Sequence, residues 1–380
     1  MKRSFCPLIE QSSVNFCITI CLFIILSSPF NTAIAGSNLI PLPSPGFIVE
    51  QTRSDLNRPA RVHNKSYSGP IIDTHAHLYP PRERDANITD INKGQLKKIL
   101  KILKKTGVKL VIFMPTPNDG IRRNQELGVV KRKMIRDMKR EKIRLFCGSN
   151  YITNWLDFAH GNGYTQGKLQ NVLKRLAKDI DSGTYSGVGE IGNYHFDKGY
   201  KQQHVIEFPT NFEPFLKIID LIAEKGIWLD LHAEPVGPKG KSYEKEVFGG
   251  IELLFRRNPH LKLIYSHTAM TNPINARRIL KKYPNIMMNV KIETKHKKWK
   301  NLAPIVNTKG ELYEDWGQIF EEMPERFMIG TDFHFGREGV QISKYKKKIK
   351  LARRLLGTVN SKAVRLIAYE NAERFFMESN

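Results

Sequence analysis

Short apolar runs alternate with segments of helical period from residue 70 onward. The apolar runs have the length and the β-branched content typical of strands. They cover residues 70–75, 108–114, 143–149, 187–191, 227–232, 262–267, 286–291 and 327–332. Between them, apolar positions recur at spacings of three and four, which is typical of helices with one buried face. These segments cover residues 94–105, 122–140, 168–181, 211–225, 243–257, 273–283, 311–322 and 338–356.

Eight strand–helix units in strict alternation favour a closed parallel barrel, the (β/α)8 or TIM barrel. A doubly wound open sheet is the main alternative, but such a sheet gathers its ligand-binding groups at one switch point. Here polar side chains end strands one, four, five, six and eight, and they converge only if the sheet closes. Residues 360–377 predict a further helix outside the barrel. We therefore predict one α/β barrel domain over residues 70–380 with an extra C-terminal helix.

The first 35 residues have the features of an export signal. A positive start is followed by the apolar run 16–26 and by the small-residue cleavage site Ala33-Ile34-Ala35. The run is shorter than the ~20 residues that span a bilayer, although an uncleaved anchor is the alternative. We predict a signal peptide at 1–35 and a periplasmic or secreted protein with no membrane span after cleavage. Residues 36–69, rich in Pro, Ser, Asn and Arg, predict an extended N-terminal arm.

The composition suits a folded domain, because 41% of the 380 residues are hydrophobic. Cys147 is the single cysteine after residue 35, so the exported chain can form no internal disulfide. The chain is strongly basic, with a formal net charge of +24. Its basic residues are spread over many predicted helices, which is typical of solvated helix faces, and a nucleic-acid surface is the alternative.

Two histidines follow the first apolar run, in Asp73-Thr74-His75-Ala76-His77. Because side chains alternate along a strand, His75 and His77 point the same way and can reach one metal ion. An isolated pair can arise by chance, but the position at the end of strand one favours metal binding. Asp73 is then expected to orient a ligand histidine, with a cap or turn role as its alternative.

Three further candidates end other strands. Glu190 follows strand four between glycines, in Gly187-Val188-Gly189-Glu190-Ile191-Gly192. A buried carboxylate needs a partner; a bridge between two cations would supply one, and an ion pair with Lys or Arg is the alternative. His232 and His267 end strands five and six. A lone histidine is more often structural, but placement at the barrel mouth opposite the histidine pair favours ligands.

Asp332 ends strand eight in Gly330-Thr331-Asp332. A carboxylate beside a metal ion can hold the ion's water and accept its proton, whereas its alternative role is a helix N-cap. Glu234 and His334 each lie two residues past a proposed ligand and are candidates for supporting that ligand or for substrate contact. Lys291 ends strand seven and could hold a substrate carboxylate or phosphate, although a surface role is an equal alternative in so basic a chain.

Together these motifs resemble those of the amidohydrolase superfamily, in the branch that includes amidohydrolase-related proteins and TatD-type deoxyribonucleases. They span residues 71–332. The resemblance implies one or two divalent metal ions, held by His75, His77 and Asp332 on one side and by His232 and His267 on the other, with Glu190 bridging. Zn is the expected metal, and Mn, Fe, Ni or Co suit the same ligands.

These residues predict an exported metal-dependent hydrolase, in which metal-activated hydroxide attacks an ester, lactone, amide or phosphoester. Asp332 would carry the proton to the leaving group. The expected partner is a small-molecule substrate, and an anionic one would suit Lys291. A TatD-like nuclease is one alternative, suggested by the charge and the basic loop 295–300. A decarboxylase-type relative with one metal ion is the other, and Glu190 counts against it. The oligomeric state stays open.

Overall fold

The computed structural model describes residues 58–62, 65–79, 93–117, 142–196, 205–237, 240–294, 304–337 and 339–377. All of them belong to one compact unit, Phe47–Asn380. The signal peptide expected at 1–35, the helix expected at 122–140 and the basic loop 295–300 lie outside the described residues, as does most of the arm expected at 36–69. The expectations for these segments stay predictions.

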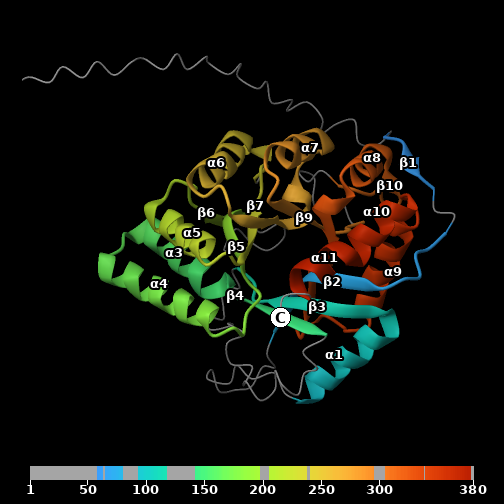
Figure 1. The fold of residues 1–380 in the computed structure, drawn as a ribbon, viewed down its shortest axis with the longest axis horizontal. Helices are drawn as coiled ribbons and strands as arrows, with labels where there is room; N and C mark the ends of the chain where they lie inside the picture. Colours follow the sequence, from blue (N-terminus) through green and yellow to red (C-terminus); the bar gives the residue numbers. More distant parts are fainter. Residues whose placement is uncertain are drawn as a thin grey trace, which may run out of the picture. The chain divides into compact units, whose positions relative to one another are not determined.

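Within the described residues, the core is a parallel sheet whose strands follow the predicted order (Figure 1). Its strands are β2 (Ile71–Leu78), β3 (Val108–Met114), β4 (Ile143–Gly148), β5 (Gly187–His195), β7 (Trp228–Ala233), β8 (Lys262–Tyr265), β9 (Ile286–Val290) and a last strand in two parts, β11 (Phe327–Ile329) and β12 (Phe333–Phe335). Their order in the sheet is β11-β9-β8-β7-β5-β4-β3-β2-β12. β2 and β5 continue further than expected, and the short β6 (Ile206–Glu207) pairs antiparallel with the end of β5.

The last strand closes the sheet into a barrel. β11 pairs in parallel with β9, whereas β12 pairs in parallel with β2, with His334 beside His77. The residues between the two parts also join β2, because the Asp332 N–H donates to the His75 carbonyl oxygen at 2.8 Å. The eighth strand is therefore bonded to both the seventh and the first. This confirms the predicted (β/α)8 barrel and excludes the open sheet.

Helices surround the strands (Figure 1). They include α1 (Lys93–Thr106), α3 (Ser149–Asn162), α4 (Gln166–Asp181), α5 (Glu213–Glu224), α6 (Glu244–Arg257), α7 (Pro273–Lys282), α8 (Glu314–Glu322) and α9 (Lys344–Leu356). The predicted apolar faces point inward: Phe215, Ile218 and Ile222 of α5 are fully buried. α3 was not predicted, and it begins directly after Gly148, whose φ of 86° turns the chain out of β4. Among the described residues, we find no helix with the length and apolar character needed to cross a bilayer.

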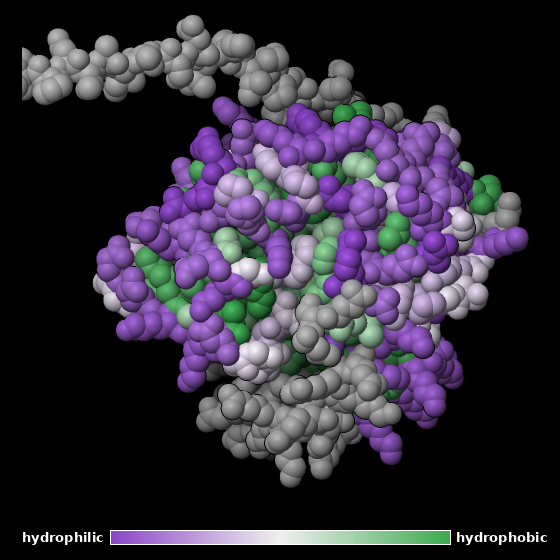
Figure 2. Space-filling view, viewed as in Figure 1, coloured by the Kyte–Doolittle hydropathy of each residue, from purple (hydrophilic) through white to green (hydrophobic). Residues whose placement is uncertain are grey.

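Hydrophilic residues cover most of the described surface in the view of Figure 2. The helices show where the basic charge lies. The sequences of α1 and α9 contain Lys and Arg but no Asp or Glu, and Lys97, Lys101, Lys346 and Lys350 on them are exposed. This distribution agrees with the expectation that the charge lies on solvated helix faces.

The C-terminal segment covers the amino-terminal end of the barrel. It consists of α10 (Ser361–Arg365), a π-helical turn (Leu366–Glu370) and α11 (Asn371–Phe376), where a further helix was predicted. The Asn371 side chain donates to the carbonyl oxygens of Pro324 and Phe327, both at 2.8 Å. The Phe376 ring lies 6.1 Å from that of Trp228, at the start of β7. Since this end is covered, a substrate would reach the barrel from the carboxyl ends of the strands.

The described part of the N-terminal arm lies against the outer helices. β1 (Ala60–Arg61) pairs antiparallel with β10 (Leu312–Tyr313). The Arg61 guanidinium forms ion pairs with Glu314 at 2.9 Å and with Glu321 at 3.0 Å, both on α8. These contacts fix residues 60–61 against β10 and α8.

Asp73 fastens the interrupted eighth strand to the first. Its fully buried carboxylate accepts hydrogen bonds from the Thr331 N–H at 2.8 Å, the Thr331 hydroxyl at 2.7 Å and the Tyr345 hydroxyl at 2.8 Å. Burial raises the pKa of Asp73, and these donors work against that shift. The expectation that Asp73 orients a ligand histidine is wrong, because its contact with His75 is to the backbone N–H and not to the ring.

We expect Asp73→Ala to destabilise the barrel much more than Tyr345→Phe. The first change leaves several buried donors without their acceptor, at about 1–3 kcal/mol each, whereas the second removes one donor at about 1 kcal/mol. Denaturant unfolding of both variants beside the wild type measures the difference. Equal shifts of the two midpoints would show that Asp73 does not hold the eighth strand.

Candidate metal centre

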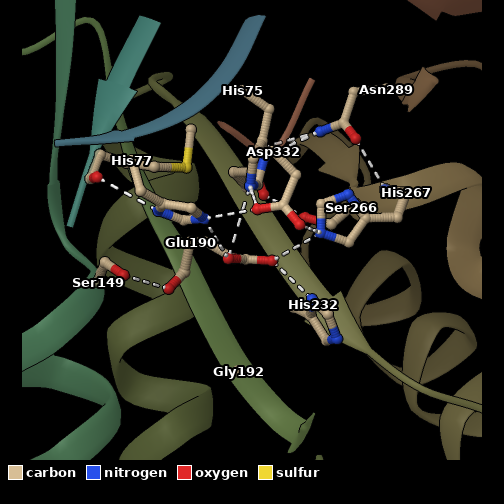
Figure 3. A network of polar contacts seen from close by, with 12 residues as sticks. His75, His77, Ser149, Glu190, Gly192, His232, Ser266, His267, Asn289 and Asp332 are labelled. Carbon is tan, nitrogen blue, oxygen red and sulfur yellow. Dashed lines mark hydrogen bonds and ion pairs between the residues drawn. The ribbon is translucent and has the colours of Figure 1, made fainter. Parts of the chain in front are cut away.

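The structure brings the six predicted ligands together at the carboxyl ends of the strands (Figure 3). They come from five parts of the sequence: His75 and His77 lie on β2, Glu190 on β5, His232 on β7, His267 directly after β8, and Asp332 between β11 and β12. The four imidazoles and the Glu190 carboxylate are buried. The convergence that argued for a closed sheet is therefore present in the folded chain.

Glu190 lies between two pairs of histidines. Its Oε2 is 3.6 Å from His75 Nε2 and 3.5 Å from His77 Nε2. Its Oε1 is 2.6 Å from His232 Nδ1 and 3.4 Å from His267 Nε2. Each carboxylate oxygen thus faces its own pair of ring nitrogens, which is the arrangement that a bridge between two cations requires.

Asp332 lies on the other side of the same cluster. Its Oδ1 is 3.0 Å from His77 Nε2 and 4.0 Å from His75 Nε2. Its Oδ2 is 4.0 Å from His267 Nε2 and contacts the Lys291 ammonium. Asp332 therefore completes a group of three donors with the histidine pair of β2.

Local backbone features place Glu190 and His267. Gly189 has a φ of 135°, and a Cβ there would collide with the backbone of Asp230, so glycine allows β5 and β7 to approach closely. His267 has a φ of 57°, which is uncommon for a residue other than glycine. The Asn289 side-chain oxygen accepts from the His267 N–H at 2.7 Å and holds this turn in place.

Opposing effects decide the charges of the two carboxylates. Burial would raise the pKa of Glu190, but His75 and His232 outweigh it and hold this pKa well below its usual value. Burial acts in the same direction on Asp332, and the charge of the Lys291 ammonium outweighs it, so the pKa of Asp332 is also well below its usual value. Both groups are therefore anions at neutral pH, as metal ligands must be.

The pKa values of the histidines His267 and His75 are shifted in opposite directions. Burial and the Lys291 charge lower the pKa of His267 well below its usual value, which leaves its ring neutral. Burial also lowers the pKa of His75, but Asp230 and Glu190 outweigh burial and raise it. A cation bound between these groups would take the place of the proton on His75.

The donor set fits divalent metal ions. The buried Nε2 of His75 has no hydrogen-bond partner among the described residues, although it faces the centre of the cluster. A lone pair on this atom, with three more imidazoles and two carboxylates around it, is the ligand chemistry of Zn, Mn, Fe, Co or Ni. The residues present could hold one ion beside His75, His77 and Asp332, and a second beside His232 and His267.

The sequence reasoning missed the support that Asp230 and Asn289 give to the ligands. The buried Asp230 of β7 lies 3.1 Å from His75 Nδ1 through its Oδ2, and the Ser266 hydroxyl donates to its Oδ1. Asn289 donates to the same carboxylate at 3.3 Å. Asp230 thus has the role that was expected of Asp73. The available signal was its position two residues before His232 on a buried strand, which puts both side chains on one face.

The three candidates for substrate contact border the centre in different ways. Lys291 and His334 have side chains that are 24% exposed, and both lie beside Asp332, with His334 Nε2 at 3.6 Å from Oδ1. The Tyr79 hydroxyl is 2.9 Å from the other ring nitrogen of His334. Glu234 is buried behind His232, with Oε1 at 3.0 Å from Nε2. Lys291 and His334 therefore lie where solvent enters, and Glu234 does not.

Comparison with known proteins gives structural likeness only. No family model and no curated protein matches the chain. Similar solved structures include a probable 2-pyrone-4,6-dicarboxylic acid hydrolase from Acinetobacter baumannii (14% identity, TM-score 0.45, covering 81% of this chain and 99% of that one). Another is 5-carboxyvanillate decarboxylase from Sphingomonas paucimobilis (11% identity, TM-score 0.46, covering 82% of this chain and 99% of that one). A third is 4-oxalomesaconate hydratase from Rhodopseudomonas palustris (11% identity, TM-score 0.48, covering 81% of this chain and 95% of that one). Because the identities and TM-scores are this low, conclusions about the fold and the function are drawn from this chain's own strands and side chains.

We expect Asp230→Asn to weaken the binding of one metal ion about 10–100-fold, as loss of a carboxylate partner of a ligand histidine does. The neutral amide no longer favours the His75 tautomer that directs Nε2 to the centre. Competition with a chelator measures the affinity. Asp220→Asn, in an ion pair with Arg257 on the protein surface, is the matched control. Unchanged affinity in Asp230→Asn would remove Asp230 from the centre.

Proposed function

We propose that this protein is an exported hydrolase of the amidohydrolase type, which uses two divalent metal ions, with Zn as the first choice. The observation that carries the proposal is the placement of Glu190, whose two carboxylate oxygens each face a separate pair of imidazole nitrogens. A site for a single ion has no need of this central bridge.

The ligands divide between the two ions as the geometry suggests. His75, His77 and Asp332 would hold the first ion, His232 and His267 the second, and Glu190 would be shared. When bound, such ions lower the pKa of water towards neutrality and polarise a carbonyl or phosphoryl oxygen. This chemistry suits an ester, lactone, amide or phosphoester.

The chain's own residues would move the proton and bind the substrate. Asp332 is an anion kept ionised by Lys291, so it can accept a proton from the attacking water and pass it to the leaving group. Lys291 and His334 lie at the partly exposed rim of the centre. The Lys291 ammonium would bind a carboxylate or phosphate on a small substrate.

Export is part of the proposal and rests on the sequence. The apolar run 16–26 and the small-residue site 33–35 are the signal that directs a chain across the membrane. We propose a periplasmic or secreted enzyme. The size of the mature protein, measured by mass spectrometry after expression of the full chain, would show whether cleavage follows residue 35.

Metal content per chain tests the central proposal. We expect two ions in the wild type and one or none in Glu190→Ala, because the bridge is lost. In Glu190→Ala, the rate of hydrolysis of esters, lactones, amides or phosphoesters should be at least ~100-fold lower than in the wild type. Glu244→Ala, a buried glutamate of α6 that is not among the proposed ligands, is the matched control.

The other outcomes separate the alternatives. One ion in both the wild type and Glu190→Ala would favour the mononuclear decarboxylase type. Cleavage of DNA with no turnover of small substrates would favour the TatD-like nuclease. Absence of metal from undepleted wild-type protein would contradict every one of these functions.

Lys291→Met should reduce the preference for anionic substrates. The charge-assisted hydrogen bond is worth about 1.5–3 kcal/mol, so the ratio of kcat/KM for an anionic over a neutral ester should fall roughly 10–100-fold. The ratio is the right measure, since the loss of Lys291 also affects Asp332 and slows both substrates. Lys281→Met, on the exposed face of α7, is the control. An unchanged ratio would place the anion site elsewhere.

A further inference from the structure

We propose that Glu234 is a positioning residue, which holds a proton on Nε2 of His232 so that this ring binds the second metal ion through Nδ1. The inference rests on the proposed two-metal function and assigns the residue that makes the second site. The sequence alone left open whether Glu234 supports a ligand or contacts the substrate.

The sequence of β7 carries the first part of the argument. In Asp230-Leu231-His232-Ala233-Glu234, three polar residues alternate with two apolar ones. Alternation along a strand puts all three polar side chains on the same side, towards the interior of the barrel. All three are buried, as are the apolar residues between them. β7 and the residue directly after it therefore supply a ligand with one carboxylate before it and another after it.

The His232 ring lies between two carboxylates. Its Nδ1 is 2.6 Å from Glu190 Oε1, on the side of the centre, and its Nε2 is 3.0 Å from Glu234 Oε1. A neutral imidazole has one N–H and one lone pair, so a ring that binds an ion through Nδ1 must carry its proton on Nε2. This buried N–H needs an acceptor, and Glu234 provides it.

Glu234 is itself held in place. Its Oε1 also accepts from the Phe196 N–H at 3.3 Å, and its own N–H donates to the Tyr194 carbonyl oxygen at 2.7 Å. Both partners belong to the end of β5 and the residue after it, the strand that carries Glu190. The geometry of the second site is thus fixed by the same pair of strands that places the bridge.

His75 shows the opposite arrangement. Its Nδ1 faces Asp230, and its Nε2 faces the centre. Each ion would therefore have one histidine supported by its own carboxylate, Asp230 on β7 and Glu234 directly after it. Because Asp230 and Glu234 contact different histidines, the two sites should be separable by mutation.

A third cation is the competing interpretation of this cluster. His195, His232 and Glu234 offer three donor atoms within 4.8 Å of one another. A cation on Nε2 of His232, together with one on Nδ1, would leave the ring without any proton. The hydrogen bond to Glu234 accounts for the same geometry with a neutral imidazole. A third ion is nonetheless an outcome that the experiment below can detect.

Two substitutions test the proposal. Glu234→Gln keeps a side-chain oxygen that can accept from Nε2 but removes the charge, whereas Glu234→Leu removes the acceptor. Metal content per chain is measured with zinc during titration with a chelator. We expect one of the two ions to bind about 10-fold more weakly in Glu234→Gln and about 100-fold more weakly in Glu234→Leu. The affinity for the other ion should be unchanged.

Two further measurements separate positioning from a general structural role. Denaturant unfolding of the metal-free Glu234→Gln protein should match that of the wild type. The double variant with Glu234→Gln and Asp230→Asn should bind both ions more weakly, because the two carboxylates act on different sites.

The outcomes that overturn the proposal are distinct. Two ions with wild-type affinity in Glu234→Leu would overturn it and leave the proposed function intact. Equally weakened binding of both ions in Glu234→Leu would also overturn it, since Glu234 would then act on the fold as a whole. Three ions in the wild type would assign the cluster to a third cation. One ion in the wild type would overturn this inference and the two-metal function together.

Discussion

A carboxylate is costly to bury unless nearby groups compensate its charge, and in this barrel that constraint falls on Glu190. Four imidazoles surround it, two at each oxygen. Its place depends on the close approach of β5 and β7, which Gly189 permits. A shift of β5 would move Glu190 away from all four histidines, and a shift of β7 would move His232 away from Glu190.

The rest of the barrel keeps this arrangement in register. The eighth strand is interrupted at Asp332 so that its carboxylate can turn towards the histidines, and Asp73 fastens the interruption through Thr331. β7 supplies His232 and Asp230, and Glu234 follows directly after this strand. Support for the ligands therefore comes from the same buried strands as the ligands themselves, which agrees with the way metal sites are usually built.

Much of the fold was predictable because strands and helices of a barrel have distinct periods. The apolar stripe of α5 and the strand before His232 were recognised from spacing alone. α3 was not, because its sequence from Ser149 to Asn162 has a weaker apolar pattern and follows its strand without a separating loop. Asp73 was assigned wrongly and Asp230 was missed for another reason, since both are buried aspartates near histidines. Only the folded chain shows that Asp230 reaches the His75 ring, whereas Asp73 accepts from the Tyr345 hydroxyl.

By itself, the sequence determined the alternation of strands and helices, the closed barrel and the identity of the residues at the strand ends. These follow from local patterns, since the period of apolar positions fixes each element and parallel strands must end at one edge. Only the tertiary structure decided which oxygen of Glu190 faces which histidine, that His75 and His232 turn opposite ring nitrogens to the centre, and that Lys291 contacts Asp332. Those are contacts between residues far apart in the chain, and their geometry depends on the closure of the barrel.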